Sequence, residues 1–195
     1  MFGIEKSRKQ IIILLTVFLI LQLIVIGLFC SSHPDYVWET IIAAGIFIVI
    51  SILQIKLKLY LGRYISGILM ITIVSHSFLG RYVGLYNTSS IYDRIQHIFG
   101  IYSFALFTYI LVNRITGKPM VSGFRDFVFI AALGMSLGVV VEVIEFLSDL
   151  LFHPPLRNQP SLLDTDLDLI SDTAGAIIAA LHWFINLKFK RNRQG

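Results

Sequence analysis

Six long apolar stretches, separated by short polar breaks, constrain the fold of this chain more than any other feature. They cover about residues 11–29, 38–55, 62–80, 93–113, 126–148 and 167–187. A helix needs about 20 residues to cross the hydrocarbon core of a bilayer. Only 14% of the residues are charged, whereas soluble domains contain about 25%. The sequence therefore predicts an all-α, polytopic membrane protein, a bundle of six transmembrane helices that occupies residues 1–195 as a single domain.

The basic residues predict the orientation of this bundle. Thirteen of the sixteen lysines and arginines lie at the same side of the six stretches, and only Arg81, Arg94 and Arg157 lie at the other side. Cytoplasmic loops of membrane proteins are enriched in lysine and arginine. We therefore expect the amino and carboxyl termini to be cytoplasmic. The same bias explains the net charge of +4 without binding of nucleic acid.

The acidic residues lie mainly toward the opposite, outer side. In two of the stretches the uncharged part is short. Only 15 uncharged residues separate Asp126 from Glu142, and only 15 separate Asp172 from Lys188. Fifteen residues of helix rise about 22 Å, which is less than the roughly 30 Å of a hydrocarbon core. We therefore expect these helices to carry acidic side chains into the outer part of the membrane.

Acidic and histidine side chains from four helices are expected at a similar depth. Counted from the inner basic residue of each stretch, His97, Glu142 and Asp172 lie about 25 Å above the inner boundary, and His76 about 20 Å. Ionisable groups at such depth are costly unless they turn inward and pair. The sequence therefore predicts an outward-facing polar pocket built by the third to sixth helices. Helical spacing places the following sets on shared faces: Asp93 with His97, Glu142 with Glu145 and Asp149, and Asp164 with Asp168 and Asp172.

Small residues are expected to bring the helices close together just below these acids. Gly134 and Gly138 have the small-xxx-small spacing that allows two transmembrane helices to approach closely. The remaining histidines, His33, His153 and His182, are expected to be loop or packing residues.

Three motifs carry a resemblance to a known family. They are Tyr92-Asp93-Arg94-Ile95-Gln96-His97, Glu142-x-x-Glu145 and Asp164-Thr165-x-x-Asp168-x-x-x-Asp172-x-x-Gly175-Ala176. Together they resemble the YjdF family of bacterial inner-membrane proteins and, more distantly, VanZ-like proteins, which are known through teicoplanin resistance. The chain departs from the VanZ-like pattern, which has Gln at the position of Glu145 and Asn at that of Asp172. The resemblance implies a multi-pass protein of the bacterial cytoplasmic (inner) membrane, and it implies no established activity.

The residues themselves favour a metal site. Several carboxylates at one depth repel one another, so either some stay protonated or a cation balances them. Histidine with carboxylates suits Zn, Mn or Fe, whereas an all-oxygen shell would suit Mg or Ca. In this hypothesis the general base is Glu145, and Asp93 orients the imidazole. The expected metal ligands are His97, Glu142, Asp168 and Asp172, and His76, Arg94, Asp149 and Asp164 are expected to line the polar pocket.

Four functions are compatible with such a pocket. The first is a metal-dependent hydrolase or transferase that acts on a lipid headgroup or a lipid-linked cell-envelope precursor, with membrane lipids as partners. The second is a binder of a cationic headgroup, peptide or antibiotic, as in VanZ-like envelope resistance. The third is a proton- or cation-coupled transporter, although the inner halves of the stretches are nearly purely apolar. In the fourth, the acids have structural roles only. Asp93 and Asp168 favour helix N-termini, and Glu142 or Glu145 pairs with Arg94 or Arg81.

Overall fold

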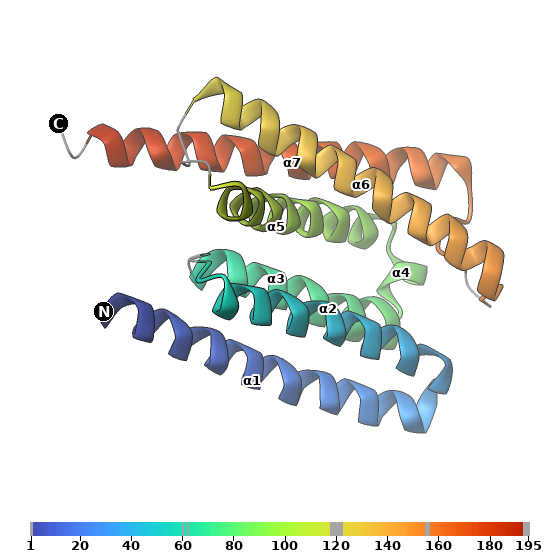
Figure 1. Cartoon of the computed structure of the whole chain (residues 1–195). Helices are drawn as coiled ribbons and strands as arrows, with labels where there is room; N and C mark the ends of the chain where they lie inside the picture. Colours follow the sequence, from blue (N-terminus) through green and yellow to red (C-terminus); the bar gives the residue numbers. More distant parts are fainter. Residues whose placement is uncertain (1, 60, 62, 118–122, 155–156, 193–195) are drawn as a thin grey trace. The chain divides into compact units, whose positions relative to one another are not determined.

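The computed structural model describes residues 2–59, 61, 63–117, 123–154 and 157–192, and this part of the chain is helical without strands (Figure 1). Lys118 and Arg193, two of the predicted inner basic residues, lie outside the described residues. The helices in chain order are α1 (Phe2–Ser32), the short 3-10 helix η1 (Pro34–Tyr36), α2 (Val37–Lys56), α3 (Arg63–Ser75), the π-helix η2 (His76–Tyr82), α4 (Leu85–Thr88), α5 (Ser90–Thr116), α6 (Phe124–Phe152) and α7 (Leu162–Asn192).

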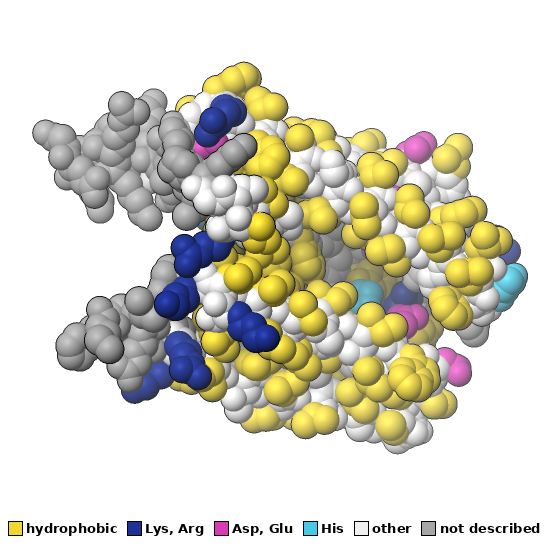
Figure 2. Space-filling view, viewed as in Figure 1, with side chains coloured by type: hydrophobic (Ala, Val, Ile, Leu, Met, Phe, Trp, Pro, Cys, Tyr) yellow, Lys and Arg dark blue, Asp and Glu magenta, His cyan; other side chains and the backbone are white. Residues whose placement is uncertain are grey.

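Six helical segments of the described residues are long and apolar enough to cross a membrane. They are Arg8–Ser32, Pro34–Lys56, Tyr64–Tyr82, Ser90–Thr116, Phe124–Phe152 and Leu162–Asn186. The prediction of an all-α protein with six spans is thus confirmed, and each predicted stretch falls on one of these segments. Figure 2 shows that apolar side chains cover the sides of the helices, as contact with lipid requires. The cytoplasmic location of the termini stays a prediction.

The chain divides into two compact units, Met1–Asp93 and Arg94–Gly195, and the boundary falls within the first turn of α5. In the first unit, α1 packs against α2 and α3. The rings of Phe18 on α1 and Phe47 on α2 lie 4.3 Å apart between centroids. Polar side chains also join these helices, because the Ser66 hydroxyl donates to Gln54 Oε1 at 3.1 Å.

The third spanning segment departs from the regular helix that its sequence predicts. It is α-helical to Ser75 and then forms the seven-residue π-helix η2. Gly80 in this wider turn is in close contact with the ring of Tyr86, and a Cβ atom at Gly80 would overlap that ring. Apolar periodicity could not reveal this change, because π-helical turns arise from local packing and are often found at functional sites.

The second unit consists of most of α5 together with α6 and α7, and α6 packs along α7. Close packing depends on glycines at the helix contacts. A Cβ atom at Gly134 would lie 2.5 Å from Ala176 Cβ, and one at Gly138 would lie 2.6 Å from Asp172 Oδ2. The predicted close contact at these two glycines is thus confirmed. The backbone of α7 at Gly175 also lies directly against the carbonyl oxygen of Ile98 on α5.

Candidate functional site

The acids of α7 form a stripe along one face of the helix. The helix begins with a polar cap, in which the Ser161 hydroxyl accepts the backbone N–H of Asp164 at 3.2 Å. Serine in this position satisfies a backbone donor that would otherwise lack a partner, and an acid in the first turn is favoured by the helix dipole. Asp168 and Asp172 follow at intervals of four residues and are each 1% exposed. The helix therefore carries two buried carboxylates into the unit.

Arg94 on α5 bridges two of these acids. Its Nη2 atom lies 2.6 Å from Asp164 Oδ1, and its Nη1 atom lies 2.7 Å from Asp168 Oδ1. A planar guanidinium suits this double contact, because its N–H groups project as a rigid fork. The sequence suggested Glu142 or Glu145 as the partner of Arg94, whereas the structure places this arginine against Asp164 and Asp168.

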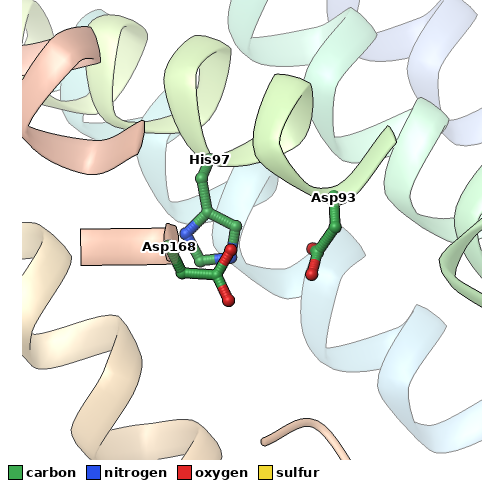
Figure 3. Close-up of side chains that lie close together, drawn as sticks. All are labelled: Asp93, His97 and Asp168. Carbon is green, nitrogen blue, oxygen red and sulfur yellow. The ribbon is translucent and has the colours of Figure 1, made fainter. Parts of the chain in front are cut away.

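His97 lies one turn after Arg94 on α5 and faces the same stripe (Figure 3). Its Nδ1 atom lies 3.0 Å from Asp172 Oδ1, and its Nε2 atom lies 3.7 Å from Asp168 Oδ1. The side chain is 9% exposed. Both ring nitrogens therefore face carboxylates. A histidine that binds a metal through one nitrogen commonly donates its other N–H to a carboxylate, and His97 has a carboxylate available for this.

Asp93 lies four residues before His97 and begins the same helix face. It stands in the first turn of α5, where the backbone N–H of Tyr92 donates to the Ser89 hydroxyl at 3.3 Å. The predicted arrangement of Asp93 one turn from His97 on a single helix is therefore present.

Glu142 on α6 completes a group of three potential ligands within the second unit. One atom each of His97, Glu142 and Asp172 lies within 4.8 Å of the others. Glu142 is 6% exposed. Two buried oxygens of this group, Glu142 Oε1 and Asp172 Oδ2, accept no hydrogen bond from the described residues. A carboxylate oxygen buried in this way is costly unless a proton or a cation compensates it.

Gln159 is a polar neighbour of this group that sequence reasoning missed. Its side-chain Nε2 atom donates to Glu142 Oε2 at 2.6 Å and to the backbone oxygen of Glu142 at 2.9 Å. The residue lies in a proline-containing loop between α6 and α7 and shows no helical spacing to the acids. The adjacent sequence Asn158-Gln159-Pro160 is typical of a turn, and a turn signal does not indicate which helix its side chains contact.

The remaining predicted residues occupy less central positions. Asp149, at the end of α6, accepts hydrogen bonds from the loop and does not belong to the group of three ligands. Glu145 lies one turn after Glu142 and is half-buried. His76 belongs to the first unit, where its Nδ1 atom lies 2.7 Å from the Tyr86 hydroxyl.

His182 packs between two helices, in agreement with its sequence context, and also makes a hydrogen bond that the sequence does not indicate. Its ring stacks on that of Tyr102 with an interplanar angle of 3°, and its Nδ1 atom is hydrogen-bonded to the Tyr102 hydroxyl. The two residues lie 80 positions apart, on α5 and α7. This pair joins the helices away from the acidic group, and no spacing rule within one helix could have indicated it.

Comparisons with known proteins agree with a membrane protein whose activity is not established. The model of a family described as "Predicted membrane protein (DUF2238)" matches residues 11–189. An uncharacterized protein of Thermotoga maritima is 33% identical over 106 residues, which represent 54% of this chain and 54% of that relative. The chain thus matches about half the length of this curated relative. No solved structure matches the chain.

Proposed function

The chain belongs to the DUF2238 family of predicted membrane proteins, and we propose that its second unit binds a divalent metal ion between α5, α6 and α7. The proposed ligands are His97, Glu142 and Asp172, whose potential ligand atoms lie within 4.8 Å of one another. Asp168, which faces His97 Nε2 at 3.7 Å, is the proposed fourth ligand.

The observation that carries this proposal is a pair of buried oxygens that accept no hydrogen bond from the part of the chain that the structure describes. Glu142 Oε1 and Asp172 Oδ2 come from different helices, and each belongs to a carboxylate that is at least nine-tenths buried. In a low-dielectric interior two such carboxylates repel each other. Glu142 and Asp172 would hold a divalent cation, which would supply the missing positive charge. A ligand set of one imidazole and three carboxylates favours Zn, Mn or Fe over Mg or Ca.

The surrounding residues can support chemistry on a substrate at this ion. A bound metal polarises an oxygen of the substrate and makes a water molecule nucleophilic at neutral pH. Glu145, one turn after Glu142, is the proposed general base that accepts the proton of this water. Asp93, one turn before His97, is proposed to orient the imidazole. The proposed substrate class is a lipid headgroup or a lipid-linked cell-envelope precursor, because the site belongs to helices that cross a membrane.

Metal analysis of the purified protein tests the binding proposal. The wild-type protein, after dialysis against Zn or Mn and removal of excess metal, is expected to retain about one equivalent. His97→Ala and Glu142→Gln are each expected to retain much less metal, because each variant removes a proposed ligand. Changing a residue that only contacts a ligand typically lowers metal affinity about 10–100-fold, and loss of a ligand should lower the affinity at least as much. The control is Asp166→Asn on α7, whose side chain is exposed, and it is expected to bind as the wild type does.

Two results would contradict this proposal. The first is a wild-type protein that retains no metal under these conditions. The second is a loss of metal in His97→Ala and Glu142→Gln that is matched by global unfolding, measured by circular dichroism in detergent. Incubation of the metal-loaded protein with a lipid extract, followed by mass spectrometry of the products, then distinguishes an enzyme from a binder that leaves the lipids unchanged. The resemblance to VanZ-like proteins, and with it a role in envelope resistance, stays a prediction.

A further inference from the structure

Asn158 and Gln159, in the loop segment just before α7, contact the end of α6 and reach the acidic group. We propose that Gln159 in this loop is a positioning residue for the metal site, which acts through Glu142 and sets how strongly the site holds its ion. This inference rests on the metal-binding function proposed above.

The loop is held in place by the carboxylate of Asp149. Asp149 Oδ1 accepts hydrogen bonds from the backbone N–H of Asn158 at 2.9 Å and from its side-chain amide at 2.8 Å. Asp149 Oδ2 accepts the backbone N–H of Gln159 at 2.9 Å. Hydrogen bonds to an ionised acceptor are the stronger kind. These three bonds therefore fix the backbone from which the Gln159 side chain extends, and they do not depend on that side chain.

The Gln159 amide then fixes the carboxylate of Glu142. Its two bonds, to Oε2 and to the backbone oxygen, are made to the same residue. Rotation of the Glu142 carboxylate would break the bond of 2.6 Å to Oε2. Because Oε2 accepts the Gln159 amide, Oε1 is the Glu142 oxygen that accepts no hydrogen bond from the described residues, and we assign it as the ligand atom. Outer-shell hydrogen bonds of this kind orient ligating carboxylates and commonly change metal affinity by about 10–100-fold.

The chemistry of the amide is specific for this task. An N–H donor satisfies one oxygen of Glu142 without adding another negative charge to a group that already contains several acids. A methionine at position 159 has a similar length but carries no donor. Gln159→Met therefore removes the hydrogen bonds while it keeps the volume of the side chain and the three backbone and side-chain bonds to Asp149.

Titration with Co²⁺, a spectroscopic substitute for Zn, tests the inference in the full-length protein. Gln159→Met and Gln159→Ala are expected to bind Co²⁺ about 10–100-fold more weakly than the wild type. The visible absorption bands of the bound ion are also expected to shift, because the orientation of one ligand changes. The comparison variant is Asn158→Ala, which removes one of the three bonds to Asp149. It is expected to weaken binding less than Gln159→Met does, because two of the bonds that hold the loop remain.

The possible results separate this inference from the proposed function. Wild-type affinity and an unchanged spectrum in Gln159→Met would overturn the positioning role and leave the metal site intact. Equal weakening in Gln159→Met and Asn158→Ala would also overturn it, because the loop as a whole would then be responsible. A wild-type protein that binds no Co²⁺, Zn or Mn would overturn both. Melting temperatures of all variants, measured without metal, show whether any loss follows from unfolding.

Discussion

Replacing Arg94 by methionine is expected to lower the free energy of unfolding of the metal-free protein by about 3–5 kcal/mol, because removal of one member of a buried ion pair leaves a buried charge uncompensated. Arg94 contacts Asp164 and Asp168 at 2.6 and 2.7 Å, and the side chain of Asp168 is 1% exposed. Methionine keeps much of the apolar stem of arginine, so the expected loss reflects the charge. Chemical denaturation in detergent micelles, followed by circular dichroism, measures it.

Two further variants make the Arg94 prediction specific. Arg114→Met changes an exposed arginine on the same helix α5, and it is expected to change the stability by less than about 1 kcal/mol, as is usual for surface charges. Adding Asp168→Leu to Arg94→Met removes the buried acid as well and is expected to recover part of the loss. An Arg94→Met protein as stable as the wild type would contradict this account. So would a double variant in which Asp168→Leu lowers the free energy of unfolding as much as it does in the wild type.

The second large effect is expected at Gly175, where alanine should lower the free energy of unfolding by about 1–3 kcal/mol, as overpacking of a tight core typically does. A Cβ atom at this position would overlap the backbone carbonyl oxygen of Ile98 on α5. A backbone atom cannot move aside as a flexible side chain can. The helices α5 and α7 would therefore have to separate, and His97 would move away from Asp172.

The same substitution at Gly45 is the control, because nothing lies within 4 Å of a Cβ atom there. Gly45→Ala lies inside α2 and is expected to be neutral or slightly stabilising, since alanine has the higher helix propensity. Both variants are compared by their denaturation midpoints and by their affinity for Co²⁺. A Gly175→Ala protein with the stability and metal affinity of Gly45→Ala would show that α5 and α7 are not in tight contact.

Much of the candidate site could be predicted because helical spacing is a local property. Asp164, Asp168 and Asp172 recur every four residues, so their common face follows from the geometry of any α-helix. The depth of Glu142 and His97 follows in the same way from the rise per residue. These arguments hold whatever the helices pack against, and this is why His97, Glu142 and Asp172 were expected together.

Other parts of the site could not be predicted, because they depend on contacts between segments far apart in the chain. The sequence predicts that Arg94 lines the pocket. Its simultaneous contacts with Asp164 and Asp168 depend on how α5 is rotated relative to α7, which the sequence does not indicate. Gln159 reaches Glu142 only because Asp149 holds the loop. The π-helix η2 accommodates the ring of Tyr86 against Gly80.

The sequence by itself determined the number of membrane spans, the helical class of the protein and the helix faces that carry its acids. These properties follow from apolar length and from the 3.6-residue period, which are set by residues close together in the chain. Only the tertiary structure decided which carboxylate oxygens near His97 are paired, with Arg94, His97 or Gln159, and that Glu142 Oε1 and Asp172 Oδ2 accept no hydrogen bond from the described residues. The physical reason is that hydrogen bonds and ion pairs depend on side-chain positions to within a few tenths of an ångström, and packing between helices sets those positions.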